Sequence, residues 1–172
     1  NLTNNSDVVT LNRSSNALTV QTISSGGGVI NSSSGNLSLG SKNIAGNDTS
    51  GSIDITNTGS ITTLGARSSG LLVQSISSGG GVVAGRSLNG ELVLGSTEEN
   101  QTSNNDDSGT ITVTNTATRI TTYGRDSNAF VVQSIAGGGG YVARSEEKLT
   151  LGSTNETNVN SGDLDVYNAS TI

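Results

Sequence analysis

The chain has 172 residues, of which 30% are hydrophobic, 2% aromatic and 13% charged, and its formal net charge is −6. It contains no His, Cys, Met, Trp or Pro, which excludes Ser-His-Asp triads, thiol nucleophiles, disulfides and imidazole or thiolate metal sites. Eight Lys and Arg against fourteen Asp and Glu give no basic surface for nucleic acid. No apolar run is long enough to span a membrane.

Four short motifs follow one another along the chain and return in three repeats. In chain order they are V-x-x-L at Val8–Leu11, QTISSGGGV at Gln21–Val29, LSLGS at Leu37–Ser41 and IDITN at Ile53–Asn57. The glutamine motif returns at Gln74–Val82 and Gln133–Tyr141, after 53 and 59 residues. Length varies only in the polar stretches between motifs, as expected if the motifs are registered strands and the rest is loop.

Apolar residues within the motifs alternate with a period of two, as in Ile53-x-Ile55, Leu71-x-Val73 and Leu92-x-Leu94. This period, and a composition in which Ile, Val and Thr total 47 residues, favours half-buried β-strands over helices. Short strands in a long-period repeat are typical of a solenoid, because each unit buries its apolar face only against its neighbours. The sequence therefore predicts an all-β fold, a β-solenoid.

The change of apolar phase predicts where each repeat bends. Leu71 and Val73 face one way, but the next apolar residue is Ile76, so we expect a bend near Gln74 and Ser75. One coil would then have three faces, carried by Ile53/Ile55, Ile61/Leu64 and Leu71/Val73, and a second coil would use Ile76, Val82 and Leu92/Leu94. Two coils per repeat predict six coils, a rod roughly 29 Å long at about 4.8 Å a coil.

Two sets of amide residues occupy equivalent positions and are candidates for hydrogen-bonded side-chain columns along the stack. They are Gln21, Gln74 and Gln133 in one set and Asn57, Asn115 and Asn168 in the other. For asparagine, the alternative is a turn residue that binds its own backbone.

Runs of glycine follow each glutamine at a fixed offset. They comprise Gly26, Gly27 and Gly28, then Gly79, Gly80 and Gly81, then Gly138, Gly139 and Gly140 after Gly137. No Lys-Ser/Thr follows them, so a phosphate loop is disfavoured. Two coils per repeat would place the runs about 10 Å apart along one edge. We expect this seam to be packed, either under the chain's own polar loops or against a neighbouring molecule, and the alternative is a sharp corner.

Carboxylates are the only residues that could act as general acid and base. The candidate groups are Glu98/Glu99 with Asp106/Asp107, then Glu146/Glu147, then Asp163/Asp165. They do not recur in register, and a glycosidase needs two carboxyl groups at a fixed separation. A solvated surface is the favoured interpretation, and a calcium site in the loop Glu98–Asp107 is the alternative. No catalytic, cofactor-binding or metal-binding residue is assigned.

The repeat resembles those of long bacterial autotransporter-type passenger proteins, which carry N-x-G-x-I strands followed by Q-S-I-x-x-G-G-G. The resembling segments are Ile53–Gly81 and Ile111–Gly140, and all three repeats take part. The chain departs from that pattern where Ser-Ser or Ala-Gly replaces the first glycines. The resemblance implies a secreted right-handed β-helix and brings no catalytic residues.

Residues 1–172 are expected to be one continuous solenoid segment of a longer array, with repeat boundaries near 1–53, 54–112 and 113–172. We expect a non-enzymatic, extracellular structural or adhesive segment, a stalk or fibre on the bacterial cell surface, without cofactors. The expected partners are further copies, neighbouring repeats of a longer chain, or a surface glycan or host receptor. A β-helical carbohydrate-active enzyme or polysaccharide-binding module is the alternative.

Overall fold

The computed structural model describes residues 1–30, 33–34, 36–40, 49–88, 91–95, 107–145, 149–152 and 159–172, and within them every regular element is a β-strand. In chain order the strands are β1 (Leu2–Asn4), β2 (Val8–Thr10), β3 (Leu18–Ile23), β4 (Gly27–Ile30), β5 (Ser33–Ser34), β6 (Leu37–Leu39), β7 (Ile53–Asn57), β8 (Ile61–Thr63), β9 (Leu71–Ile76), β10 (Gly80–Leu88), β11 (Leu92–Leu94), β12 (Ile111–Asn115), β13 (Ile120–Thr122), β14 (Phe130–Ile135), β15 (Gly139–Ser145), β16 (Leu149–Leu151) and β17 (Leu164–Asn168). The predicted all-β solenoid of stacked parallel strands is confirmed.

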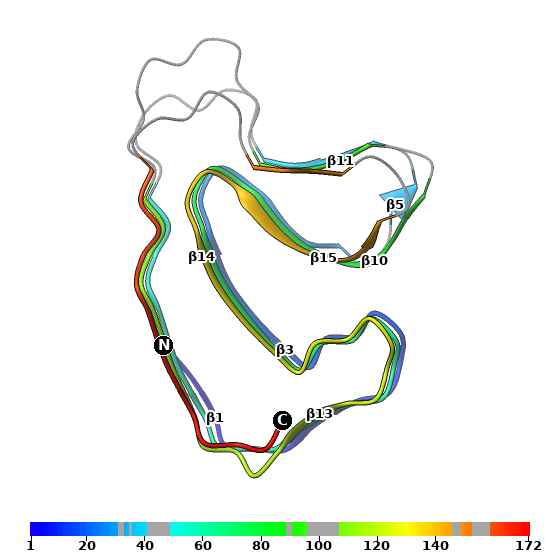
Figure 1. Ribbon diagram of the computed structural model, residues 1–172, viewed down its shortest axis with the longest axis vertical. Coiled ribbons are helices and arrows are strands. Elements are labelled where there is room, and N and C mark those ends of the chain that lie inside the picture. Colours follow the sequence, from blue (N-terminus) through cyan, green and yellow to red (C-terminus); the bar gives the residue numbers. More distant parts are fainter. Residues whose placement is uncertain are drawn as a thin grey trace.

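One repeat makes one layer of the stack. Each strand pairs with the equivalent strand of the next repeat, as Gln74 does with Gln21 on one side and Gln133 on the other. The prediction of two coils per repeat is therefore wrong, because hydrogen-bonded neighbours are a whole repeat apart rather than half of one. Figure 1 looks down the stacking axis, which is the shortest axis of the molecule, so these layers form a wide, short stack instead of a thin rod.

The chain doubles back on itself within each layer, which explains how a single coil accommodates so many residues. In the middle layer β7 and β8 form two adjoining sides, β9 crosses the centre, β10 returns beside β9, and β11 lies beyond β10 (Figure 1). Three apolar clusters fill the spaces between these segments. Each layer therefore contributes to three separate apolar cores rather than to a single one.

The largest cluster lies between β7, β8 and β9. In the middle layer it contains Ile53, Ile55, Ile61, Leu71 and Val73, each no more than 5% exposed. Three faces do meet here, as the apolar spacing predicted. Leu64 is an exception, since it is 48% exposed: Ile61 and Thr63 point inward, so the alternation along β8 turns Leu64 outward.

The strand β9 is continuous from Leu71 to Ile76, so the predicted bend near Gln74 and Ser75 does not occur. The side chains continue to alternate between the two faces of the strand. Leu71 and Val73 belong to the first cluster, whereas Leu72 belongs to a second cluster with Val82 and Ala84 of β10. Both faces of β9 are buried, which is why all six of its residues are inaccessible.

The residues assigned to a second coil lie in the same layer, farther along the folded chain. Val82 is part of the cluster between β9 and β10, and Leu92 and Leu94 pack with Val83 between β10 and β11. Ile23, Ile76 and Ile135 form one column, since they pair in register, and Ile76 is fully buried. Its side chain faces the glycine strand β10 rather than the first core, since Ile23 and Ile135 lie against the equivalent Gly27 and Gly139.

The reversal between β9 and β10 is made by two consecutive residues with positive φ, Ser78 at 62° and Gly79 at 79°. The same pair of conformations recurs at Ser25 and Gly26 and at Gly137 and Gly138. The strands that flank the reversal belong to different sheets, so their side chains, not their backbones, face each other. This reversal is a sharp corner, which the sequence offered as the alternative to a packed glycine seam.

Candidate functional site

The three glutamines form a hydrogen-bonded column inside the stack. The Nε2 of Gln21 donates to Oε1 of Gln74 at 2.7 Å, and Nε2 of Gln74 donates to Oε1 of Gln133 at 2.6 Å. Gln74 is fully buried, so these two bonds supply its side-chain amide with hydrogen-bond partners where water has no access. Both bonds point in the same direction, from the first layer to the third.

A second column of amides runs through Asn57, Asn115 and Asn168. It begins one repeat earlier, at Asn4 of the first layer. Each Nδ2 donates to the Oδ1 of the asparagine in the next layer, at 2.6–2.7 Å. Asn57 also donates to the carbonyl of Gly59, two residues on, at 3.1 Å. The ladder and the local turn bond, which the sequence offered as alternatives, therefore coexist on the two hydrogens of one amide. Asn4 was left out of the predicted set, although its position follows from aligning Leu2 with Ile55.

A column of hydroxyl groups links the end of β9 to the segment that precedes β7, and sequence reasoning missed it. The Oγ atoms of Ser50 and Ser75 lie 2.8 Å apart, and Ser75 also accepts from the backbone N–H of Gly109 at 2.8 Å. The next layer repeats the contact between Ser108 and Ser134, at 2.7 Å. Because the chain is so rich in serine, no sequence pattern distinguishes these residues from loop residues. The one available signal is that Ser75 is a polar residue within an otherwise apolar strand.

The glycine runs lie inside the stack in its middle layer, where Gly79, Gly80 and Gly81 are all buried. Gly80 pairs with Gly27 on one side and Gly139 on the other, so neighbouring runs are one strand spacing apart, not the two we predicted. A Cβ on Gly80 would strike the backbone of Gly139. Ile23 and Ile135 lie against Gly27 and Gly139, and the glycine strands of the neighbouring layers flank Gly80 on both sides.

The described carboxylates do not gather into a site. Asp54 and Asp165 occupy the same column, but Thr112 lies between them, and both aspartates are exposed. Among the described residues no group of three or more acidic side chains is placed to hold a metal ion. Glu98, Glu99, Asp106, Glu146 and Glu147 lie outside the described residues; Asp107 is described and accepts a hydrogen bond from Nδ2 of Asn160 at 3.0 Å.

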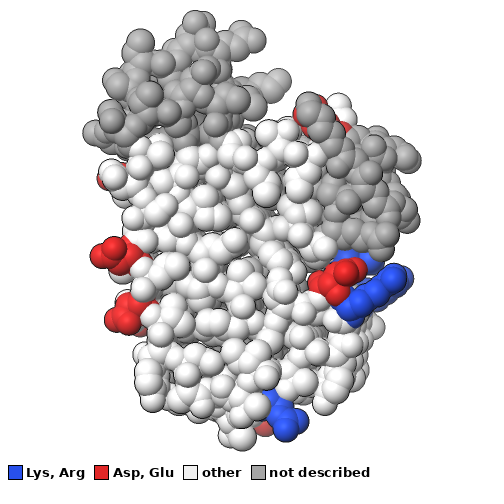
Figure 2. Space-filling view, in the orientation of Figure 1, with Lys and Arg blue, Asp and Glu red and all other residues white. Residues whose placement is uncertain are grey.

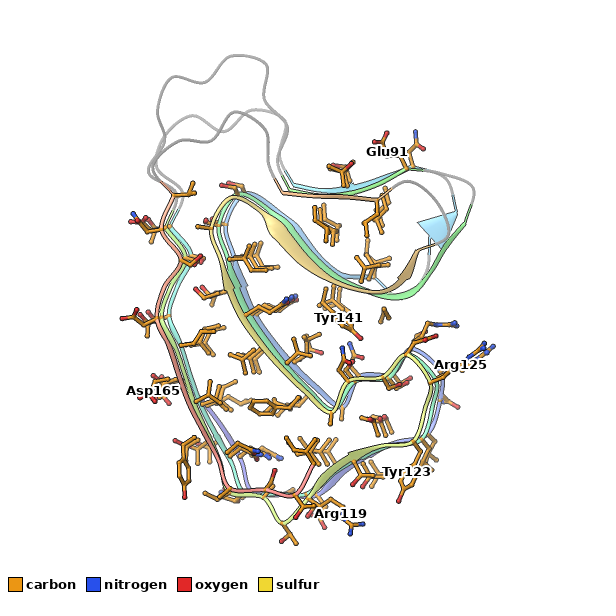
Figure 3. The ribbon with its side chains drawn as sticks, viewed as in Figure 1. Glu91, Arg119, Tyr123, Arg125, Tyr141 and Asp165 are labelled. Atoms are coloured by element: carbon orange, nitrogen blue, oxygen red, sulfur yellow. The ribbon has the colours of Figure 1, made fainter. Side chains whose placement is uncertain are left out.

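The side of the stack has an exposed apolar ridge where β8 and its equivalents end. Leu11, Leu64 and Tyr123 follow one another along it, exposed by 67%, 48% and 67%. Arg119 and Arg125 project outward on either side of Tyr123 along this edge of the layer, and Asp165 points outward from the opposite side (Figure 3). Figure 2 looks onto one end of the stack and shows the described charged side chains around its rim, with an uncharged surface between them.

No protein-family model, curated protein or solved structure matches the chain. The described part of the chain contains no helix of the length and apolarity needed to cross a bilayer. What the arrangement does chemically is therefore judged from its own residues: columns of amides and hydroxyls that bond along the stacking axis, and few charges at the surface.

Proposed function

We propose that the chain is a non-enzymatic structural segment of an extracellular bacterial surface protein, a β-solenoid stalk or fibre of the autotransporter-passenger type. The observation that carries the proposal is the use of buried polar groups. Gln74, Asn57 and Ser75 are fully buried, and each bonds to an adjacent layer or to an adjacent segment of its own coil. Such groups stabilise the stack and leave none of these side chains for chemistry.

Two further features support an extracellular role. The chain has no Cys or Met to oxidise, and its surface is rich in Asn, Ser and Thr. The resemblance of its Q-S-I-x-x-G-G-G motifs to passenger repeats supports the proposed class, and a right-handed coil is proposed because parallel crossovers are right-handed in almost all known cases. Adhesion to a surface glycan or a host receptor belongs to the proposal, with the side ridge at Leu64 and Tyr123 as the most exposed apolar surface.

Immunogold labelling of intact cells of the source organism tests the location. Antibodies against the folded 172-residue chain should label unbroken cells beyond the outer boundary of the envelope. Labelling that appears only after lysis would refute the extracellular role, and a cytoplasmic marker detected in parallel shows whether the cells were intact.

Incubation with polysaccharides separates the proposal from a carbohydrate-active enzyme. A hydrolase or lyase would release reducing or unsaturated ends from at least one substrate class, including uronic acid polymers. We expect no release above a heat-denatured control. Release that survives repurification of the protein would refute the non-enzymatic assignment.

A further inference from the structure

The edge of the stack that carries the apolar ridge also carries arginine in every layer. Four of the eight Lys and Arg of the chain lie on this edge: Arg13, Arg67, Arg119 and Arg125. Figure 2 shows blue side chains only along the lower and right parts of the rim, and only red ones on the left. The ridge edge is therefore locally basic in a chain whose net charge is −6.

The loops that follow β2, β8 and β13 stack on one another as the strands do. Ser14 N–H donates to the carbonyl of Ala66 at 3.0 Å, and Arg67 N–H donates to the carbonyl of Arg125 at 2.9 Å. Ser14, Arg67 and Asp126 also share one backbone conformation, with φ of 55°, 57° and 58°. Each loop carries one arginine, so the arginines follow one another along the stacking axis at about 4.8 Å.

The middle layer shows that this surface belongs to the side of the stack. Leu64 and Arg67 have a further layer on either side, and yet Leu64 is 48% exposed and Arg67 only half-buried. A positive φ is uncommon for arginine, whereas it suits the aspartate at the equivalent Asp126. The Nε of Arg67 is also buried without a hydrogen-bond partner among the described residues, which costs free energy. The stability of the loop gives no reason for arginine here, whereas binding of an anion does.

The guanidinium groups on this edge are available to a ligand. None of the four forms an ion pair or a side-chain hydrogen bond with another residue that the structure describes. The same loops and strand starts carry two exposed aspartates, Asp7 and Asp126, and Oδ1 of Asp7 already accepts the N–H of Ser60 at 2.8 Å. Four arginines against two aspartates leave an excess of two positive charges on the edge.

The spacing of the arginines distinguishes between classes of anionic partner. Duplex DNA presents one charge per about 1.7 Å of its axis. An extended peptide brings side chains to one face every 6.7 Å or so, about twice its rise per residue. Neither matches layers at about 4.8 Å, and a second copy of this chain would bring arginine against arginine. An extended chain of uronic acids has one carboxylate per sugar and advances by close to one layer per sugar.

We infer that this edge binds a linear polysaccharide with a carboxylate on each sugar, laid along the stacking axis. Arg13, Arg67 and Arg125 each bind one carboxylate, for which the planar guanidinium offers two parallel N–H donors. Leu64 and Tyr123 contact the apolar C–H faces of the sugar rings. The acidic side of the layer does not prevent binding, because exposed charges more than about 8 Å apart are largely screened at physiological salt. The inference rests on the proposed adhesive function and names its ligand class.

Isothermal titration calorimetry of the 172-residue chain with polygalacturonate tests the inference. The fully methyl-esterified polymer is the matched ligand without charge, and we expect binding to the acid form and none to the ester. Tyr123→Ser should weaken binding to the acid form as well, since it removes the largest exposed apolar contact on the ridge. Equal binding of acid and ester would overturn the inference.

Single substitutions locate the binding surface. Arg67→Gln and Arg125→Gln should each weaken binding by about two- to five-fold, because each removes one exposed ion pair. Ser52→Asp is the control, since it changes the net charge by the same amount on the side of the layer where Asp54 and its equivalent Asp165 point outward. Its affinity should equal that of the unsubstituted chain. An equal loss in all three variants would overturn the assignment to this edge.

Two further outcomes complete the test. Circular dichroism shows which variants are folded, and Arg125→Gln keeps the test decisive if Arg67→Gln does not fold, because Arg125 is exposed and has no positive φ. Polyglutamate or a single-stranded oligonucleotide that binds as tightly as polygalacturonate would indicate general attraction to polyanions and overturn the inference. A folded chain that binds none of these polymers overturns the ligand of this edge only, since the extracellular location is decided by the labelling experiment.

Discussion

Replacing Gly80 with alanine tests whether the glycine run is required by close approach between layers or only by backbone conformation. Gly28 is the matched control. The two have nearly the same φ, 146° and 149°, so an alanine at either position incurs similar backbone strain, on the order of 1–3 kcal/mol. Their surroundings differ, because a Cβ on Gly80 would strike the backbone of Gly139, whereas a Cβ on Gly28 has no atom within 4 Å.

The additional cost at Gly80 comes from the ladder. Gly139 N–H donates to the carbonyl of Gly79 at 3.2 Å and Gly138 N–H donates to the carbonyl of Ser77 at 2.9 Å, and moving the segment around Gly139 away from Gly80 weakens both bonds. At about 0.5–1.5 kcal/mol for each bond, Gly80→Ala should destabilise the protein by about 1–3 kcal/mol more than Gly28→Ala. Urea unfolding followed by circular dichroism measures the difference, provided that the m-values agree. Equal losses for the two variants would refute the argument from interlayer approach.

Three further predictions follow from the stacking of equivalent residues. Ile76→Asp should cost several kcal/mol in the free energy of unfolding, because it buries an unpaired carboxylate; a near-native melting temperature would contradict the buried column. Gln74→Ala should cost about 2–4 kcal/mol and Gln21→Ala about half of that, since the first removes two amide bonds and the second one; identical urea midpoints would argue against the ladder. A single repeat of residues 54–112 should be largely unfolded by circular dichroism, and a sharp cooperative melt would count against stabilisation by neighbouring layers.

The columns could be predicted because the spacing within each motif is fixed, which aligns Gln21, Gln74 and Gln133 whatever the loops do. The number of layers could not be predicted with the same ease, since a change of apolar phase at Ile76 is compatible with a bend or with a strand buried on both faces. The signal that favours the second is the continuous apolar run Leu71-Leu72-Val73, matched by Phe130-Val131-Val132. Contacts such as Ser50 with Ser75 depend on the fold of the layer, so no local pattern revealed them.

The hydrogen-bonding register of each ladder is independent of the length of the loops that connect the strands. The offset is 53 residues between β2 and β8 and 59 residues between β8 and β13, and yet both pairs of strands are matched residue for residue. For the gene, this makes the whole layer a unit of duplication and deletion. Unequal recombination between two repeats adds or removes one layer and leaves matching surfaces on both sides of the junction, so the length of the solenoid can change in a single genetic event without any compensating substitution.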